Sequence, residues 1–360
     1  MRYDEHETDS PASAAVAGSA PGASRTAERA AWNPVTGLSG WDPSTGPPGW
    51  GPAERDETRP QRIPPALPRD PQVRDLSPFG RPARHSWEIP LLVIVVLLTV
   101  VAYPFSLYAV VKGTDNVYLG LLAFAPILIW FVRGSQWAQA RVYGVKMSPT
   151  QFPEAHRMVA EAAARFGMKK PPDAYVIMGN GQLNAFAAGH GFRKYVAVYS
   201  DLFEIGGRAR QPEALAFVIG HEVGHIAAGH TSYWRQLGTI LMQFIPFLGP
   251  ALSRSQEYTA DNHGYSYSYT GAAPTMTTFA GGKYLNVLVG FDEMADRAFT
   301  ETGFFVWLTN AQASHPVHTW RMWALRDRSR HGKLFLRPSP PRSVPVPPAA
   351  QWPKQPELAR

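Results

Sequence analysis

Cysteine is missing from all 360 residues of the chain. Without it the protein forms no disulfide bonds and offers no thiolate to a metal ion. A zinc site in this chain must therefore be built from histidine, aspartate, glutamate or water. The absence is also compatible with a cytoplasmic location, where disulfides are rare.

Aliphatic residues are scarce at the two ends of the chain, where most of its 34 prolines lie. Such segments bury too little apolar surface to offset the entropy lost on ordering. We expect residues 1–85 to form a disordered Pro/Gly-rich cytoplasmic tail and residues 336–360 a second, Pro-rich disordered tail. Trp32–Gly37 is echoed by Trp41–Gly46, and this repeat is either a docking unit for an unknown partner or drift in a proline-rich segment.

Basic residues outnumber acidic ones, giving a formal net charge of +7 and a pI near 9.6. The lysines and arginines are scattered, and they form no basic run with interleaved aromatic residues. We therefore expect no nucleic-acid partner. Attraction to the anionic headgroups of a lipid bilayer accounts for the charge more simply.

Two long apolar runs follow the first tail. Ile89–Val111 is uncharged, apolar on all sides, and long enough as a helix to cross a hydrocarbon core of about 30 Å. Asn116–Val132 is shorter but reaches the lower end of the spanning range. Since about 80 residues precede the first run and no cleavage site is evident, we expect a retained anchor: a two-span transmembrane hairpin over residues 86–135.

Positive charges flank the predicted hairpin on one side. They are Arg74, Arg81 and Arg84 before the first span and Arg133, Arg141 and Lys146 after the second. The connection between the spans offers only Lys112, beside Asp115. By the positive-inside tendency, both long flanking parts face the cytoplasm. We expect a multi-pass protein integral to the plasma membrane.

A third apolar stretch, Gln236–Leu252, is too short for a helical hairpin through a bilayer. It carries Pro246, Gly249 and Pro250 near its end. It is a buried helix, an interfacial segment or, less in keeping with its length, a further span.

The segment after the predicted spans, residues 136–335, reads as an α+β domain that is mainly helical with a small sheet. Apolar residues at helical spacing predict a helix over Pro153–Phe166, closed by a glycine. Ala174–Met178 and Tyr195–Tyr199 read as strands, and we expect the second to be an exposed edge to which a substrate peptide adds. Pro212 then opens another helix.

That helix carries the sequence His221-Glu222-Val223-Gly224-His225, an H-E-x-x-H motif. The two histidines are four residues apart, so both imidazoles project from the same helix face and can coordinate one metal ion. Glu222 is placed to take a proton from water as a general base. Because buried histidine and glutamate need partners, the apolar surroundings favour a metal site over a chance match.

A catalytic zinc needs a third protein ligand and an open position for water. The metzincin pattern would require Gly at position 228 and His at position 231, where the chain has Ala228 and Thr231. His230 is one position short, and we expect it to cap the helix end instead. We assign the third ligand to Glu257 of a later helix and the orientation of a histidine ring to Asp261, four residues on. The alternative is an exposed acidic helix face.

Together, His221-Glu222-x-x-His225 and Ser253-Arg254-x-x-Glu257-x-x-Ala260-Asp261 resemble the HtpX-like and CAAX prenyl endopeptidase family of membrane zinc peptidases, which are gluzincins. The resemblance implies a zincin-type metalloprotease domain that binds one Zn²⁺ per subunit. It covers residues 91–326. Relatives often carry two more spans between the H-E-x-x-H helix and the ligand glutamate, where this chain has only Gln236–Leu252.

Two further segments share the resemblance. Asn184, Ala185 and Phe186 match an Asn-Ala-Phe segment beside the catalytic cleft, which implies substrate binding. His315, followed by a proline, and Arg321 match a His-Pro and trailing arginine element. The resemblance implies that His315 helps to stabilise the oxyanion and that Arg321 engages Asp261 or the substrate. Asn184 as a turn residue and His315 as a helix cap remain open.

These observations predict a membrane-anchored zinc metalloendopeptidase that hydrolyses unfolded or damaged membrane and cytoplasmic proteins in quality control. Specificity for one prenylated peptide is less favoured, because the chain has too few spans for a large membrane chamber. Two alternatives stay open. One is a catalytically inert membrane scaffold, and the other is a zinc hydrolase with a non-protein substrate.

Overall fold

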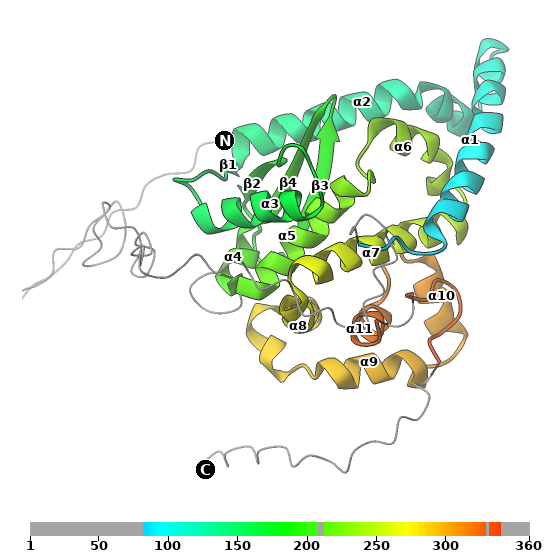
Figure 1. The fold of residues 1–360 in the computed structure, drawn as a ribbon. Coiled ribbons are helices and arrows are strands. Elements are labelled where there is room, and N and C mark those ends of the chain that lie inside the picture. The colour runs from blue at the N-terminus through cyan, green and yellow to red at the C-terminus, as the bar shows by residue number, and fades with distance from the viewer. Residues whose placement is uncertain (1–81, 207–211, 329–330, 340–360) are drawn as a thin grey trace, which may run out of the picture. The chain divides into compact units, whose positions relative to one another are not determined.

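The computed structural model describes residues 82–206, 212–328 and 331–339 (Figure 1). The repeat at Trp32 and Trp41 and almost all of the two predicted tails lie outside these residues.

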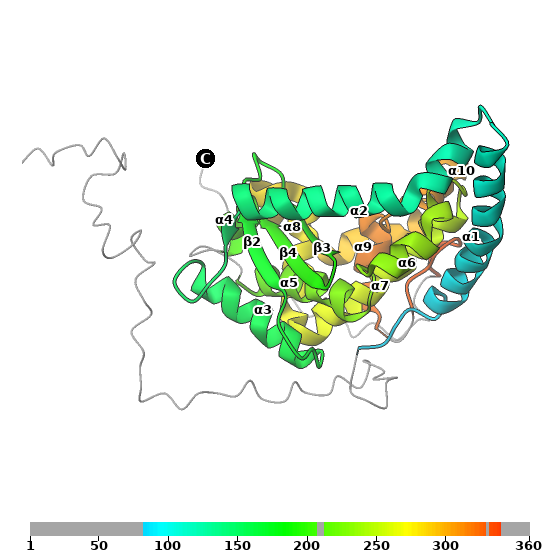
Figure 2. The ribbon, with the colours of Figure 1, turned by 90° about the horizontal axis from the view of Figure 1, so that it is seen from above.

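The first two helices are long and apolar enough to cross a membrane. They are α1 (Glu88–Val111) and α2 (Val117–Tyr143), and they confirm both predicted apolar helices. Asn116 caps α2, since its side-chain oxygen accepts the Tyr118 and Leu119 amides. The two helices diverge from their connecting turn. The amino-terminal end of α1 lies beside a later helix, α7 (Leu248–Tyr267), and α2 runs over the sheet (Figures 1 and 2).

Helix α2 continues beyond its apolar run. The predicted boundary between hairpin and domain, at residues 135 and 136, falls inside this unbroken helix. Ala140 packs with Tyr175, Tyr195 and Ala197 in one buried cluster, and Trp137 lies against it. The carboxyl half of α2 therefore covers one face of the sheet (Figure 1).

The sheet has four strands in the order β1-β2-β4-β3. Their bounds are β1 (Val145–Lys146), β2 (Asp173–Ile177), β3 (Ala185–His190) and β4 (Arg193–Tyr199). Strand β4 runs parallel to β2 and antiparallel to β3. The two predicted strands are present as β2 and β4, but the prediction that Tyr195–Tyr199 is an edge is wrong. That segment lies between β2 and β3, so among the described residues β3 forms the edge on its side of the sheet and β1 forms the opposite edge.

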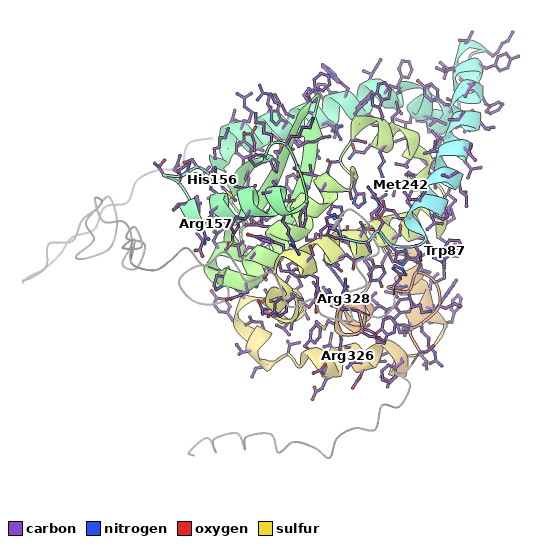
Figure 3. The ribbon with its side chains drawn as sticks, in the orientation of Figure 1. Trp87, His156, Arg157, Met242, Arg326 and Arg328 are labelled. Carbon is purple, nitrogen blue, oxygen red and sulfur yellow. The ribbon has the colours of Figure 1, made fainter. Side chains whose placement is uncertain are left out.

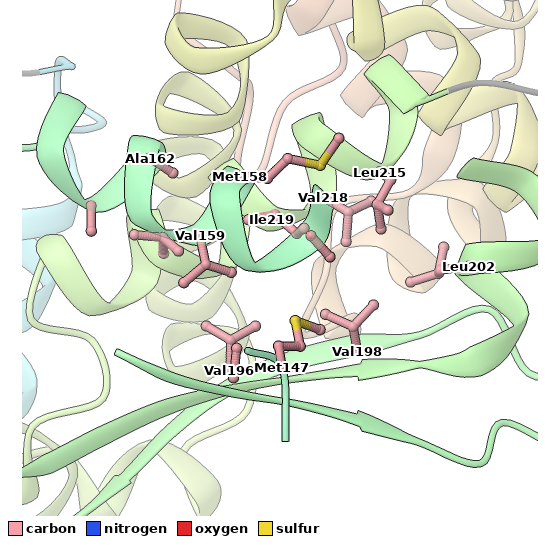
Figure 4. Close-up of a cluster of buried hydrophobic side chains, with 14 of the residues drawn as sticks. Met147, Met158, Val159, Ala162, Val196, Val198, Leu202, Leu215, Val218 and Ile219 are labelled. Atoms are coloured by element: carbon pink, nitrogen blue, oxygen red, sulfur yellow. The ribbon is translucent and has the colours of Figure 1, made fainter. Parts of the chain in front are cut away.

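The other face of the sheet is covered by α3 (Pro153–Arg165) and α5 (Pro212–Ala227), with α4 (Ser200–Gly206) at one end. Val159 and Ala162 of α3 meet Val196 and Val198 of β4 in a cluster that also holds Ile219 of α5 (Figure 4). Each of these side chains is almost fully buried. The predicted helices at residues 153 and 212 are thus present, and this core fixes α5 against the sheet.

A second, helical part follows α5. Its elements are α6 (Tyr233–Gly238), η1 (Ile240–Gln243), α7 (Leu248–Tyr267), η2 (Tyr269–Gly271), α8 (Ala272–Leu285), η3 (Asn286–Leu288), α9 (Phe291–Thr300), α10 (Phe304–Gln312) and α11 (His318–Arg326). Its core holds Leu252, Met276 and Trp323 together with Leu91 and Val95 of α1. The expected mainly helical α+β fold is confirmed.

The stretch Gln236–Leu252 forms the end of α6, η1 and the start of α7. The Tyr233 hydroxyl donates to the Pro126 carbonyl of α2 at 2.8 Å, and Phe244 packs edge-on against Tyr118. Met242, labelled in Figure 3, packs against the second core, which includes Leu91 and Val95 of α1. This segment therefore packs against both apolar helices, in keeping with burial or contact rather than a further span.

Candidate active site and metal centre

Glycines let α5 and α7 approach closely. A methyl group on Gly224 of α5 would lie 2.4 Å from the Cβ of His263 on α7. One on Gly264 of α7 would lie 2.9 Å from the Phe217 carbonyl oxygen of α5. Real Cβ contacts are almost never this short, so only glycine fits at either crossing point. The crossing brings the H-E-x-x-H face of α5 onto the acidic face of α7.

Three predicted metal ligands meet at this crossing. The His221 and His225 Nε2 atoms are 3.2 Å apart, and they lie 3.4 Å and 3.3 Å from the two carboxylate oxygens of Glu257. A tetrahedral zinc site with bonds of about 2.0–2.1 Å has ligand-to-ligand distances of about 3.3–3.4 Å. The His221 contact is with Oε2 and the His225 contact with Oε1, so each contact is close to the tetrahedral spacing, and one donor atom from each of the three residues lies within 4.8 Å of the others. Both donor types are ones that zinc accepts.

A carboxylate and a guanidinium orient the His221 ring. Its Nδ1 lies 3.0 Å from Asp261 Oδ1. Asp261 in turn accepts two hydrogen bonds from Arg321, at 2.6 and 2.7 Å. Burial alone would raise the pKa of Asp261, but Arg321 and His221 lower it to about 2. The carboxylate therefore stays ionised and holds the Nδ1 proton of His221, which turns Nε2 toward the site.

The site attracts positive charge. Burial opposes protonation of His221, yet hydrogen bonds with Asp261 and Glu257 raise its pKa to about 9 in the metal-free protein. Burial would also raise the pKa of Glu257, but the charge of His225 and hydrogen bonds from His221 and His225 hold it well below its usual range. A buried carboxylate that stays ionised needs a cation close to it.

The His225 ring is oriented by another imidazole. Its Nδ1 lies 2.8 Å from Nδ1 of His230, and Nε2 of His230 lies 3.2 Å from Oε1 of Glu88. The prediction that His230 caps the helix holds for its backbone, since its N–H donates to the His225 carbonyl at 2.9 Å, but its side chain makes no cap. Helix α5 ends at Ala227, the chain turns at Gly229 with a φ of 79°, and His230 returns into the interior.

A cavity of about 280 Å³ opens beside the three donors. Glu222, the predicted general base, lines it together with His221 and Glu257. Asn184 and Ala185 line it from the start of β3, and His315 and Arg321 line it from the carboxyl-terminal part. Elements far apart in sequence thus contribute the predicted residues to one cavity.

Two of these residues differ in detail from the predictions. His315 Nε2 lies 3.5 Å from Glu257 Oε1, while its side chain remains 66% exposed in the loop before α11. Asn184 uses its side-chain oxygen locally, accepting the Ala185 amide at 2.9 Å. Both side chains are therefore at the rim of the cavity, and Asn184 also has the local bond of a turn residue.

Phe186 is not brought to the site. Side chains alternate along a strand, so Ala185 and Phe186 point to opposite faces of β3. Ala185 packs on the core beneath α3 and α5, whereas Phe186 lies edge-on against Tyr195 in the cluster under α2. The substrate-binding assignment of Phe186 is corrected accordingly.

Two overlapping segments of the chain, residues 149–248 and 234–329, match the model of peptidase family M48. Together they cover half of the chain. The chain belongs to peptidase family M48. This confirms the family suspected from the four sequence motifs and makes the chain a metallopeptidase of that family. The crystal structure of Ste24p from S. mikatae is similar with 16% identity and a TM-score of 0.33, over 64% of this chain and 67% of that one.

In this M48 peptidase, the sequence motifs missed several residues of the cavity and its surroundings. Thr275 and Phe279 of α8 and His318 of α11 also line the cavity. Burial lowers the pKa of His318, which favours a neutral ring. Only His318 had a usable signal, because it follows His315 by three residues. Glu88 was missed as a site residue because it lies far before His225 in the sequence, and His230 was missed because it was expected only to cap the helix.

Proposed function

We propose that this M48 peptidase is a membrane-anchored zinc endopeptidase in which His221, His225 and Glu257 bind one Zn²⁺. The matched spacing of the three donors, at 3.2–3.4 Å, is the observation that carries the proposal. Ligands built only from nitrogen and oxygen suit a catalytic zinc with one open position. Zinc would supply a Lewis acid that polarises a peptide carbonyl and makes water acidic enough to attack it.

The protein's own groups would handle the protons and the substrate charge. Glu222 lies in the cavity next to His221, so its carboxylate would take a proton from the attacking water and pass it to the leaving amine. His315 at the rim would donate to the substrate carbonyl oxygen as negative charge develops there. Arg321 would act through Asp261 by fixing the His221 ring rather than by touching substrate.

A peptide substrate would add to the edge strand β3. Its first residue, Ala185, and the preceding Asn184 line the cavity, so a strand paired with this end of β3 would run past Glu222. Main-chain hydrogen bonds demand little of the substrate sequence. The proposed substrates are unfolded or damaged membrane and cytoplasmic proteins, and the proposed role is protein quality control.

The two apolar helices support a membrane protein, since each is long and apolar enough to cross a bilayer. We propose that both cross the plasma membrane and that the peptidase domain faces the cytoplasm. The supporting observation is the excess of arginine and lysine before α1 and after the apolar run of α2. The proposal places the cavity near the bilayer, because α1 supplies residues of the same core as α7.

The test compares Glu222→Gln with the wild-type protein in detergent, measuring bound zinc and digestion of an unfolded protein such as casein. Glu213→Gln, an exposed position in the first turn of the same helix, is the matched control. We expect Glu222→Gln to keep stoichiometric zinc and to lose about 10²–10⁴-fold in activity, while the control is unchanged. Full proteolysis by Glu222→Gln would remove Glu222 as the base. A wild-type protein without zinc would indicate a scaffold, and one with zinc but no proteolysis would indicate another hydrolase.

A further inference from the structure

The two histidine ligands differ in what orients them. The carboxylate of Asp261 accepts a hydrogen bond directly from Nδ1 of His221. His225 faces the ring of His230 instead, at 2.8 Å between the two Nδ1 atoms. A metal-binding histidine usually donates its second N–H to a carboxylate, carbonyl or water, so the role of His230 depends on its own second contact.

Proton positions along this contact chain follow from the geometry. If His225 presents the Nε2 lone pair to the metal, its Nδ1 carries the proton and donates to Nδ1 of His230. His230 then carries its proton on Nε2, which lies 3.2 Å from Glu88 Oε1. With both rings neutral, His225 donates to His230 in the first contact, and His230 donates to Glu88 in the second. Glu88 thus becomes the carboxylate end of an extended histidine relay.

Glu88 is held firmly in place. It is fully buried at the first residue of α1. Its Oε1 accepts from Arg84 at 2.6 Å and from Arg235 of α6 at 2.7 Å, and its Oε2 accepts from the Thr259 hydroxyl of α7. Two guanidinium groups keep this buried carboxylate charged, which an unpaired carboxylate in the interior would not remain.

The relay joins three regions of the chain. Glu88 opens the first apolar helix, His230 lies in the turn after α5, and His225 is in the metal-binding face of α5. Arg84 also donates to the Ala228 carbonyl at 2.7 Å, which ties the approach to α1 to the same turn. Movement of α1 away from the domain would remove the acceptor of His230 and loosen His225.

We propose that His230 and Glu88 are positioning residues of the metal site, fixing the tautomer and orientation of His225 and coupling the first apolar helix to zinc binding. The inference rests on the proposed zinc site. A buried ion pair that served stability alone would change unfolding but would not change metal affinity or the geometry around the metal.

Substitutions at His230 can separate its two contacts. Asparagine places its side-chain oxygen near the position of Nδ1 and keeps an acceptor for His225, whereas glutamine places its polar group near Nε2 and keeps only the contact with Glu88. Leucine removes both contacts. Glu88→Gln tests the far end of the relay. Asp201→Asn is the matched control, because Asp201 is a buried carboxylate paired with Lys283 at 2.7 Å outside the relay.

The full-length protein is measured in detergent for zinc affinity by chelator competition, for the visible spectrum of the cobalt-substituted site, and for thermal unfolding without metal. We expect His230→Leu, His230→Gln and Glu88→Gln to bind zinc about 10–100-fold more weakly and to alter the cobalt spectrum. His230→Asn should retain most of the affinity. Asp201→Asn should lower thermal stability and leave both metal readouts unchanged.

Equal zinc affinity of the asparagine and glutamine variants, or wild-type metal readouts for His230→Leu and Glu88→Gln, would overturn the relay. This failure is distinct from failure of the proposed function. If only the relay fails, the wild-type protein still binds zinc and cleaves casein. If the proposed function fails, the wild-type protein does not do both. Because asparagine and glutamine bury similar groups, a difference in affinity between them cannot be assigned to general misfolding.

Discussion

Replacing Gly224 with alanine tests whether the close crossing of α5 and α7 assembles the metal site. The new methyl group would lie 2.4 Å from the Cβ of His263, about 1 Å closer than an ordinary carbon contact. The helices must separate or tilt to accommodate it. His221 and His225 lie on α5 and Glu257 lies on α7, so separation lengthens the donor distances of 3.3–3.4 Å between the helices.

The size of the effect follows from two opposing contributions. Overpacking of a tight core contact costs about 1–3 kcal/mol, and the better helix propensity of alanine offsets about 1 kcal/mol of that. We expect net destabilisation of up to about 2 kcal/mol, and 2 kcal/mol corresponds to a fall in Tm of about 4–8 °C for a domain of this size. Zinc affinity should fall as well, because the ligands no longer match a tetrahedral ion.

The assay is thermal unfolding in detergent together with zinc affinity by chelator competition. Gly120→Ala in α2 is the matched control, since nothing lies within 4 Å of its added methyl group. It should leave zinc binding unchanged and stability equal or slightly higher. If Gly224→Ala unfolded at the wild-type temperature and bound zinc with the wild-type affinity, the close crossing would not be what positions the ligands.

Glu257→Ala should abolish stoichiometric zinc binding, whereas Asp261→Asn should weaken it about 10–100-fold. Both are measured by metal analysis after dialysis, and full retention of zinc by Glu257→Ala would contradict the ligand assignment. Burial lowers the pKa of His85 and of His263 to about 4. Between pH 6.5 and pH 4 both histidines are therefore protonated in the unfolded state and neutral in the folded state. The contribution of these two neutral histidines to stability is therefore complete above pH 6.5. It should fall toward pH 4 in chelator-treated protein, by up to about 1.4 kcal/mol per pH unit for each histidine, and a flat denaturation midpoint between pH 6.5 and pH 4 would refute this prediction. In the cysteine-free chain, Asp115→Cys should react with a membrane-impermeant maleimide on intact cells and Lys169→Cys only after lysis, and the reverse pattern would invert the topology.

Helical spacing made the proposed metal ligands predictable from the sequence. His221 and His225 stand one turn apart, as do Glu257 and Asp261, and a helix places such pairs on one face whatever surrounds it. The structure needed only to bring the two faces together. The requirement for a third donor then pointed to Glu257 because cysteine is absent and the metzincin positions hold other residues.

Strand β3 and its consequences were not predictable in the same way. Ala185–His190 is rich in alanine and glycine, which have little preference for strands, so pairing with β4 rather than propensity makes it a strand. Because β3 was not predicted, Tyr195–Tyr199 of β4 was predicted to be an edge. Phe186 was placed beside the cleft by its resemblance to the Asn-Ala-Phe segment alone. Alternation along the strand sends its ring to the opposite face.

The apolar helices were predicted as a module separate from the catalytic domain, but the contacts run across that boundary. Leu91 and Val95 of α1 are 5% and 0% exposed in the core that also holds Leu252 of α7. Glu88 adds a buried polar network at the same junction. A protein that begins at residue 136 would lose all of these contacts as well as most of α2. The peptidase domain therefore depends on its apolar helices for part of its core, and these helices belong to the folded unit that holds the proposed metal ligands.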